Sequence, residues 1–311
     1  MSDPSCLPIL PTNRCYEVDE YLHATYDFQG DCLIRATSSK DHRSNVSPAE
    51  LARRWGTSLP VAENTLKVTT QHGIRYITQD NLSCRFRTRQ AQLGHKWLRT
   101  AVYSDTAFGP CKSTRGFECA QVFVTDQHYT KVYPMKSKSE AFIALNSFCH
   151  TVGIPNPLVT DNAGEETFGE WEEVRKKFLM EQRYTEPHSP WQNKAELEIR
   201  ELRKHYRRIM HKKRVPEVLW CYCLEYVSEI WSFTAKHGQD QRTPYESVIG
   251  ETPDISEYIE FEFHDWIKYW DPHAKMPGEQ LGKWLGVCKN VGAAMTYWIL
   301  KDNGNVVARS L

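Results

Sequence analysis

The chain has 311 residues, and its 39 lysines and arginines balance its 39 aspartates and glutamates, so the formal net charge at pH 7 is zero. This balance excludes a uniformly basic nucleic-acid coat protein and an acidic disordered tail. The composition is typical of folded domains, with 40% hydrophobic and 25% charged residues, and the length predicts about two of them. No apolar stretch approaches the roughly 20 residues of a membrane helix, so we expect no membrane association.

The first part of the chain predicts a small helical module. Residues 1–46 follow no clean periodicity and stay unassigned. The sequence SPAE at 47–50 is a capping box with Ser47 as N-cap, and it predicts a helix that ends near Gly56. A second helix follows in VAENTLKVTTQ. We therefore predict a DNA-binding-like module of helix-turn-helix type, with a basic linker, over residues 47–98.

Residues 99–240 alternate strand-like and helical patterns, which predicts one α/β domain. Its expected strands are 99–105, 119–125, 129–135, 157–161 and 182–186, the first three adjacent and antiparallel. Its expected helices start at Ser137, where SKSE forms a cap, near residue 167, at Ser189 and at Pro216. The predicted fold class is thus α/β, with a mixed five-stranded sheet and flanking helices.

The C-terminal part changes to aromatic-rich strands. We predict a linker over residues 241–257 and a small β-barrel over residues 258–311, in which the Asp302-Asn303-Gly304 turn forms a hairpin. The ten cysteines contain no C-x-x-C pair, so no structural zinc site is predicted. Five of them lie in apolar periodic segments and are expected to be buried thiols: Cys119, Cys149, Cys221, Cys223 and Cys288.

Two carboxylates lie where expected strands end. Asp105 closes the first strand and Asp161 the fourth, and side-by-side strands bring such residues to one edge of a sheet. A third lies on the helix expected from Ser189 to about His211. That helix buries one stripe, consisting of Ala195, Ile199, Leu202, Tyr206 and Ile209. A second stripe, rotated by about 100°, consists of Glu196, Arg200, Arg203 and Arg207.

Three carboxylates that meet at a sheet edge either take up protons or hold cations. Oxygen ligands select hard metals, so the set favours Mg²⁺ or Mn²⁺, and two such ions about 4 Å apart promote phosphodiester displacement. Alternatives stay open for each residue taken alone. A strand-terminal aspartate is often a turn residue, Glu196 and Arg200 form an ordinary helix pair, and Asp126 competes with Asp105.

The ordered segments YSDTAFGP, CAQVFVTDQ, GIPNPLVTDNAGEE and TEPHSPWQNKAELEIRELRK resemble the integrase core of copia-type LTR retrotransposons, in a divergent branch associated with protists. This family has an RNase H-like fold. The resemblance places its metal ligands on Asp105 in D-x-x-x-G-P, on Asp161 in TDNAGEE and on Glu196 beyond SPWQN. It matches Asp126 to a family aspartate that is not a ligand. The C-terminal strands resemble the SH3-like barrel of integrases.

Two departures from the family pattern concern the third ligand. Asn193 is followed by Lys194 where glycine is usual, and Glu196 comes three residues after Asn193, so Glu198 remains a weaker candidate. The His-His-Cys-Cys zinc module found at the start of integrases is missing from the sequence. We expect the helical module at residues 47–71 to replace it or to lie beside its remnant.

The resemblance implies a metal-dependent polynucleotidyl transferase that trims element DNA ends and joins them to target DNA, using two Mg²⁺ or Mn²⁺ ions. We expect a homo-multimer that is made in the cytoplasm and acts on double-stranded DNA in the nucleus. The residues expected to contact DNA are Lys136, Lys138, Gln192, Asn193, Lys194, Arg200, Arg203, Lys204 and Arg207. The alternatives are a catalytically inactive or domesticated integrase-derived DNA-binding protein and an RNase H-like nuclease that cuts without joining.

Overall fold

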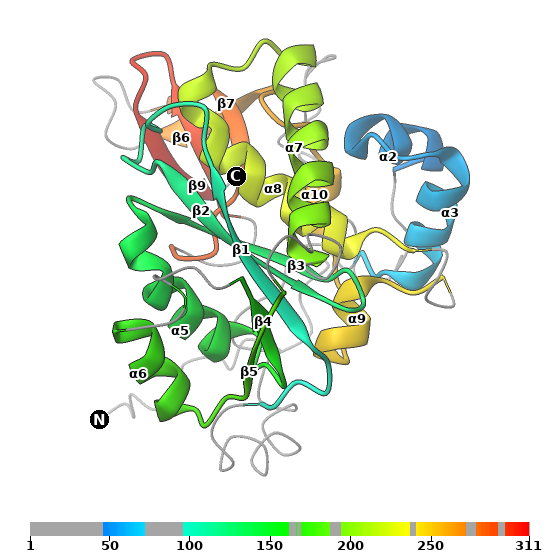
Figure 1. Cartoon of the computed structure of the whole chain (residues 1–311). Helices are drawn as coiled ribbons and strands as arrows, with labels where there is room; N and C mark the ends of the chain where they lie inside the picture. Colours follow the sequence, from blue (N-terminus) through cyan, green and yellow to red (C-terminus); the bar gives the residue numbers. More distant parts are fainter. Residues whose placement is uncertain are drawn as a thin grey trace, which may run out of the picture.

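The computed structural model describes residues 46–71, 96–161, 166, 169–186, 194–236, 241–271, 278–291 and 296–310. Its centre is a five-stranded sheet in the order β3-β2-β1-β4-β5 (Figure 1). The strands are β1 (Val102–Phe108), β2 (Cys119–Thr125), β3 (Thr130–Met135), β4 (Leu158–Thr160) and β5 (Gln182–Tyr184). Neighbours β1, β2 and β3 pair antiparallel, whereas β4 pairs parallel with β1 and with β5. This is the mixed sheet of the predicted RNase H-like core.

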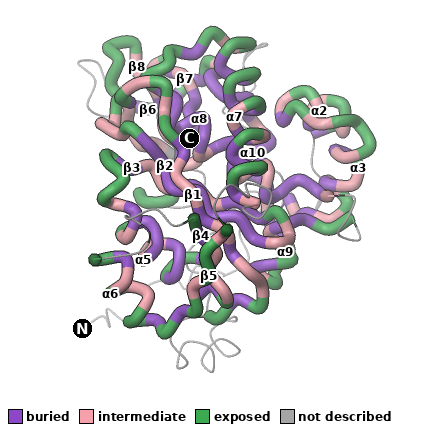
Figure 2. Tube along the Cα trace, in the orientation of Figure 1, coloured by how far each residue is buried: buried purple, intermediate pink, exposed green. Residues whose placement is uncertain are grey.

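Helices cover both faces of this sheet. On one face lie α5 (Ala141–Thr151), which follows the 3₁₀ turn η2 (Lys138–Glu140), and α6 (Glu170–Lys177). On the other face α7 (Lys194–Lys212) packs against β1 and β2, and α8 (Trp220–Phe233), which follows η5 (Glu217–Leu219), packs against β3. Every residue of β2 is buried, as Figure 2 shows by its colour, because both of its faces are covered.

The alternation of side chains along β1 separates two hydrophobic cores. Ala107 and Tyr103 contribute to the core under α7 and α8, whereas Val102 belongs to the core under α5. Successive side chains of a strand point to opposite faces, so residues two apart share a face. Asp105 therefore lies on the α7 face of the sheet, between Tyr103 and Ala107.

The predicted N-terminal helices are present as α2 (Pro48–Trp55) and α3 (Leu59–Val68). The predicted cap is confirmed, because the Ser47 hydroxyl accepts a hydrogen bond from the Glu50 amide at 3.2 Å. Trp55 is buried, and its indole nitrogen donates to the Tyr258 carbonyl at 3.2 Å. The helical module is thus packed against the C-terminal part of the chain. Most of the predicted basic linker, residues 72–95, lies outside the described residues.

The region predicted as a linker over 241–257 contains helix α9 (Pro244–Ile249) and leads into α10 (Ser256–Ile259). An antiparallel sheet follows, with β6 (Trp266–Asp271), β7 (Gly278–Val287), β8 (Thr296–Lys301) and β9 (Val306–Ser310) in sequence order. The predicted hairpin turn is confirmed, since Gly304 has a φ of 81° and its amide bonds to the Lys301 carbonyl at 2.9 Å.

The region predicted as a barrel forms this four-stranded antiparallel sheet. Arg309 on β9 donates to Asp271 on β6 at 3.3 Å, so the two edge strands approach each other. Within the described residues no backbone ladder joins them. The five cysteines expected to be buried are all buried and free. Among the described helices, none has the length and apolar character needed to traverse a bilayer.

Candidate active site

Asp105 lies inside β1 and not at its end. The strand predicted to stop at Asp105 continues to Phe108, and Asp105 is paired with Val122 of β2. The predicted strand end at Asp105 was wrong, because the chain leaves the strand only at Gly109. A Cβ atom at Gly109 would overlap the Trp220 indole, so the glycine of the D-x-x-x-G-P pattern lets α8 approach the end of β1.

Asp161 directly follows β4 and comes level with Asp105. The parallel register of the two strands pairs Val102 with Leu158 and Tyr103 with Val159. Continued by two residues, this register brings position 161 beside position 105. Leu158 belongs to the core under α5, so by alternation Asp161 points to the opposite face, where α7 lies. The charge of Asp161 contributes to raising the pKa of Asp105, in agreement with this register.

Glu196 lies in the first turn of α7 and is exposed. The predicted buried stripe of this helix is confirmed in full: Ala195, Ile199, Leu202, Tyr206 and Ile209 are all buried. Because that stripe fixes which side of α7 faces the sheet, Glu196 comes at the border of the contact between α7 and β1. The expected helix start at Ser189 lies outside the described residues.

The three carboxylates act on one another electrostatically. Burial raises the pKa of Asp105 most, and the charges of Asp161 and Glu196 raise it further, to about 6. A hydrogen bond from the Thr106 amide at 2.7 Å and the nearby Lys138 ammonium oppose this increase. A carboxyl whose pKa is raised by burial and by like charges is stabilised by any cation that binds beside it.

The donor set fits a hard divalent cation, because all three groups are carboxylates. Within the described residues, no three His, Cys, Asp or Glu side chains already stand in a metal-binding arrangement. Asp161 and Glu196 are exposed, so both side chains have room to change rotamer toward Asp105. The site therefore has the chemistry of a magnesium or manganese site, and coordination requires the side chains to draw together.

Asp126, the competitor of Asp105, lies at the end of β2 in a different environment. The Tyr103 hydroxyl donates to its carboxylate at 3.3 Å, and the Lys194 ammonium donates to the same oxygen. The ammonium also lies 5.4 Å from the centre of the Tyr103 ring. Lys194, expected to contact DNA, is thus paired within the chain, and Asp126 holds the beginning of α7.

Glu198, the weaker candidate for the third ligand, is buried on another side of α7. Its carboxylate lies 2.5 Å from Nδ1 of His128, which belongs to the turn between β2 and β3. The side chain of Glu198 is only 7% exposed, whereas Glu196 is an exposed residue. The geometry favours Glu196 over Glu198 as the partner of Asp105.

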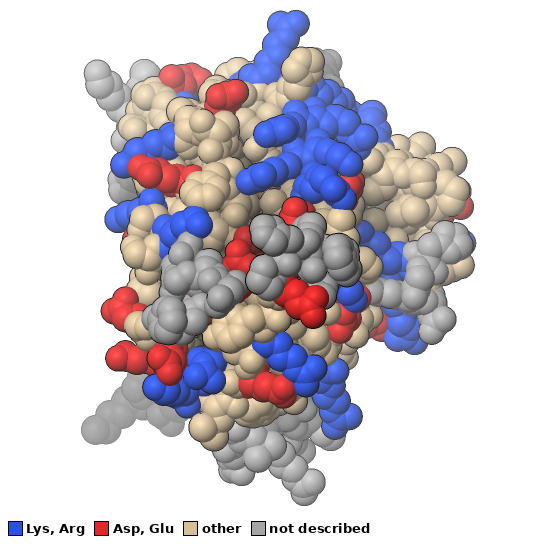
Figure 3. Space-filling model, viewed as in Figure 1, with Lys and Arg blue, Asp and Glu red and all other residues tan. Residues whose placement is uncertain are grey.

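The residues expected to contact phosphates are distributed over and around α7. Figure 3 shows lysines and arginines gathered over this helix, above a group of acidic side chains. Arg200, Lys204 and Arg207 are exposed, and Lys204 pairs with Glu201 at 2.7 Å. Lys136 and Lys138 are exposed beside the end of β3. Gln192 and Asn193 lie outside the described residues.

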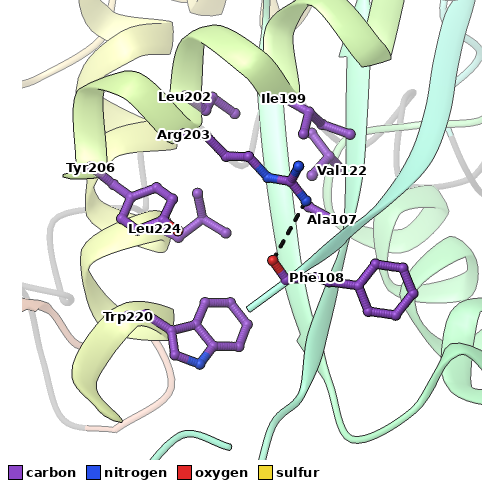
Figure 4. Close-up of a pocket in the computed structure, with 9 residues that line it drawn as sticks. All are labelled: Ala107, Phe108, Val122, Ile199, Leu202, Arg203, Tyr206, Trp220 and Leu224. Carbon is purple, nitrogen blue, oxygen red and sulfur yellow. Dashed lines mark hydrogen bonds between the residues drawn. The ribbon is translucent and has the colours of Figure 1, made fainter. Parts of the chain in front are cut away.

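Arg203 has a different place from the other basic residues of α7. Its guanidinium reaches back to the Phe108 carbonyl at 3.5 Å, across a small hollow between β1, α7 and α8 (Figure 4). The hollow has a volume of about 10 Å³, room for about one water molecule. Trp220 and Leu224 line it from α8. Arg203 thus bridges the helix and the end of β1, close to the candidate site.

One buried polar cluster near Asp161 was not predicted. Glu166 accepts a hydrogen bond from the Gln121 side chain, which also donates to the Ser104 hydroxyl at 2.6 Å. The Gln182 amide donates to the Glu166 carbonyl at 2.7 Å and to the Thr160 hydroxyl at 2.8 Å. Glu166 is thereby bound to β2 and β5 of the sheet. The only signal in the sequence was its position within TDNAGEE.

No protein-family model and no curated protein matches the sequence. Similar solved structures include a chain of the cryo-EM structure of the simian T-cell lymphotropic virus intasome in complex with PP2A regulatory subunit B56 gamma. It shares 13% identity at a TM-score of 0.44, over 85% of this chain and 96% of that chain. Another is the HTLV-2 integrase catalytic core domain in complex with magnesium, in its trimeric form. It shares 13% identity at a TM-score of 0.37, over 48% of this chain and 95% of that one.

Proposed function

We propose that the chain is a polynucleotidyl transferase of the integrase type, which trims the ends of an element's DNA and joins them to target DNA. One observation carries the proposal. Asp161 and Glu196 act electrostatically on Asp105 at the α7 face of the sheet, where burial and these two charges raise the pKa of Asp105 to about 6. Such a carboxylate group costs free energy unless it binds cations, and divalent cations are what phosphodiester displacement requires.

The three carboxylates would hold two Mg²⁺ or Mn²⁺ ions, which supply activation of the attacking oxygen and stabilisation of the leaving oxygen. The other residues of the chain hold the substrate. Lys138, whose charge reaches Asp105, is placed to bind a phosphate next to the site. Arg200 and Arg207, exposed along α7, continue that contact along the DNA backbone.

The finer assignment rests on the sequence resemblance to copia-type integrases. We propose double-stranded DNA as the substrate, both as element ends and as target, and the nucleus as the place of action. Joining two DNA ends to one target requires two sites in one assembly, so we also propose that the protein works as a homo-multimer.

The test is a strand-transfer assay with the element's terminal sequence, in Mg²⁺ and in Mn²⁺, on wild type and on Asp161→Asn. We expect wild type to trim and join DNA ends, and the variant to lose both activities while it still binds DNA. Cutting without joining would identify a nuclease. DNA binding with a steep salt dependence, without cutting or joining by either protein, would contradict catalysis and favour the DNA-binding alternative.

A further inference from the structure

The turn between β2 and β3 (residues 126–129, the β2–β3 turn) contacts the beginning of α7, at Lys194 and Glu198. Asp126 accepts a hydrogen bond from the Lys194 ammonium, and Nδ1 of His128 lies 2.5 Å from the Glu198 carboxylate. In sequence, the two contacts flank Glu196 at positions −2 and +2. The candidate third ligand is therefore the centre of a segment that is held at both ends.

The β2–β3 turn is itself firmly built. The His128 backbone has a positive φ of 61°, and its amide donates to the Thr125 carbonyl at 2.9 Å. The Tyr129 amide donates to the Thr125 hydroxyl at 3.2 Å, and the Thr100 hydroxyl donates to Gln127 at 2.8 Å. The turn is bonded to residues of β2 and to the segment before β1. Its contacts with α7 therefore fix the position of this helix relative to β1, the strand that carries Asp105.

The helical repeat determines what these contacts do. Lys194 and Glu198 are four residues apart, so their side chains leave α7 about 40° from each other, on the side of the β2–β3 turn. Glu196 leaves the helix about 180° from the midpoint of that pair. Ala195, which is fully buried, faces the sheet between the two directions. The β2–β3 turn therefore holds α7 on one side, and Glu196 leaves the helix on the opposite side.

The exposure of the contact between Lys194 and Asp126 indicates a role in orientation more than in stability. The side chains of Lys194 and Asp126 are 44% and 36% exposed. Exposed ion pairs contribute little to the free energy of unfolding. Two contacts one helical turn apart nevertheless restrict rotation of α7 about its axis. A single contact would still allow this rotation. Rotation is the motion that would carry Glu196 away from Asp105.

We propose that Asp126 and His128 are positioning residues, which hold Lys194 and Glu198 and thereby aim the Glu196 carboxylate at Asp105 and Asp161. This inference rests on the proposed function. It assigns a role to Asp126 that is separate from metal ligation, although its position at a strand end resembles that of a ligand. It also explains why Glu198 is buried only two residues from an exposed glutamate.

The experiment uses the full chain with the double substitution Asp126→Asn and His128→Asn. An asparagine at 126 keeps an oxygen for the Tyr103 hydroxyl, and one at 128 tolerates a positive φ. Lys176→Gln, which breaks an exposed Lys–Glu pair of 2.8 Å on α6, is the matched control. Two quantities are measured: the strand-transfer kcat with KM for DNA, and Mn²⁺ affinity without DNA, by electron paramagnetic resonance.

We expect kcat to fall by about 10–100-fold in the double variant, as for other residues that orient metal ligands, with KM for DNA unchanged. Mn²⁺ affinity should fall as well, and Asp126→Glu, which restores the charge, should recover part of both losses. Lys176→Gln should match wild type. Asp126 and His128 act on Glu196 only if kcat and Mn²⁺ affinity fall together.

The proposal is overturned if the double variant matches wild type in kcat and Mn²⁺ affinity, or if only KM for DNA rises, since the turn would then serve DNA binding. An inactive wild type that binds Mn²⁺ would contradict the proposed function alone, and the Mn²⁺ affinities of the variants would still decide on positioning. A wild type that neither reacts nor binds Mn²⁺ would contradict both.

Discussion

At the scale of single residues, the charged form of Asp105, which the proposed function requires, lowers the free energy of unfolding. A carboxyl with a pKa of about 6 in the folded chain and an ordinary value of 3.8 binds its proton more tightly when the protein is folded. The folded state then holds more protons than the unfolded state between about pH 4 and pH 6. The free energy of unfolding therefore decreases as the pH rises through that window, and the full cost applies above it.

Asp105→Asn should consequently stabilise the metal-free protein at pH 7.5, by about 2 kcal/mol after allowance for the partial exposure of the carboxylate. Below about pH 4 the variant and wild type should have equal stability. Mg²⁺ should raise the melting temperature of wild type more than that of the variant. Urea unfolding at the two pH values checks the first point and thermal unfolding with Mg²⁺ the second. Equal free energies of unfolding at pH 7.5 would show that the charged Asp105 carboxylate does not destabilise the folded protein.

At the scale of elements, α7 shows what periodicity predicts and what it does not. The five apolar residues of its predicted stripe follow from the 3.6-residue repeat, and the structure confirms that each of them is buried. The repeat also predicted Glu196 at the border of the buried face. It could not predict that Glu198 is buried, because the partner that makes this possible, His128, lies 70 residues earlier in the chain.

The candidate site was predictable in part for the same reason. Asp105 and Asp161 are brought together by a strand pairing that the alternation of strands and helices already indicated. The pairing of Asp126 with Lys194 and the return of Arg203 to the Phe108 carbonyl depend on side-chain reach across distant segments. Local patterns of charge carry no information about such contacts. For this reason the sequence predicted only DNA contacts for Lys194 and Arg203.

At the scale of the whole molecule, the zero net charge is the sum of tracts with opposite charge, two of which are in contact. Residues 194–214 have nine basic and three acidic side chains, and residues 251–271 have seven acidic and one basic. The tracts meet at buried Glu262, which pairs with Lys212 at 2.6 Å, with Lys213 at 2.7 Å and with Arg53 of the helical module at 2.9 Å. The C-terminal end of α7 is thus engaged internally, and the basic surface available to DNA is smaller than the sequence indicates.

Arg200→Gln and Arg207→Gln test this division of the helix. Each should weaken binding to any duplex and lower the slope of log K against log salt by about 1, as expected for the loss of one phosphate contact. Lys212→Gln is the matched control, because its ammonium is bound by Glu262, and it should leave the slope unchanged. Fluorescence anisotropy over a series of salt concentrations measures these slopes. A change for Lys212→Gln equal to that of the arginines would contradict the division.

The central claim is that Asp105, Asp161 and Glu196 share one divalent-cation site on the α7 face of the sheet. The most direct measurement is anomalous diffraction from crystals of wild type and of Asp161→Asn soaked in Mn²⁺. We predict an anomalous peak among the three carboxylates in wild type that is lost or much reduced in the variant. Manganese peaks that avoid these carboxylates in wild-type crystals, or that persist there unchanged in Asp161→Asn, would contradict the claim.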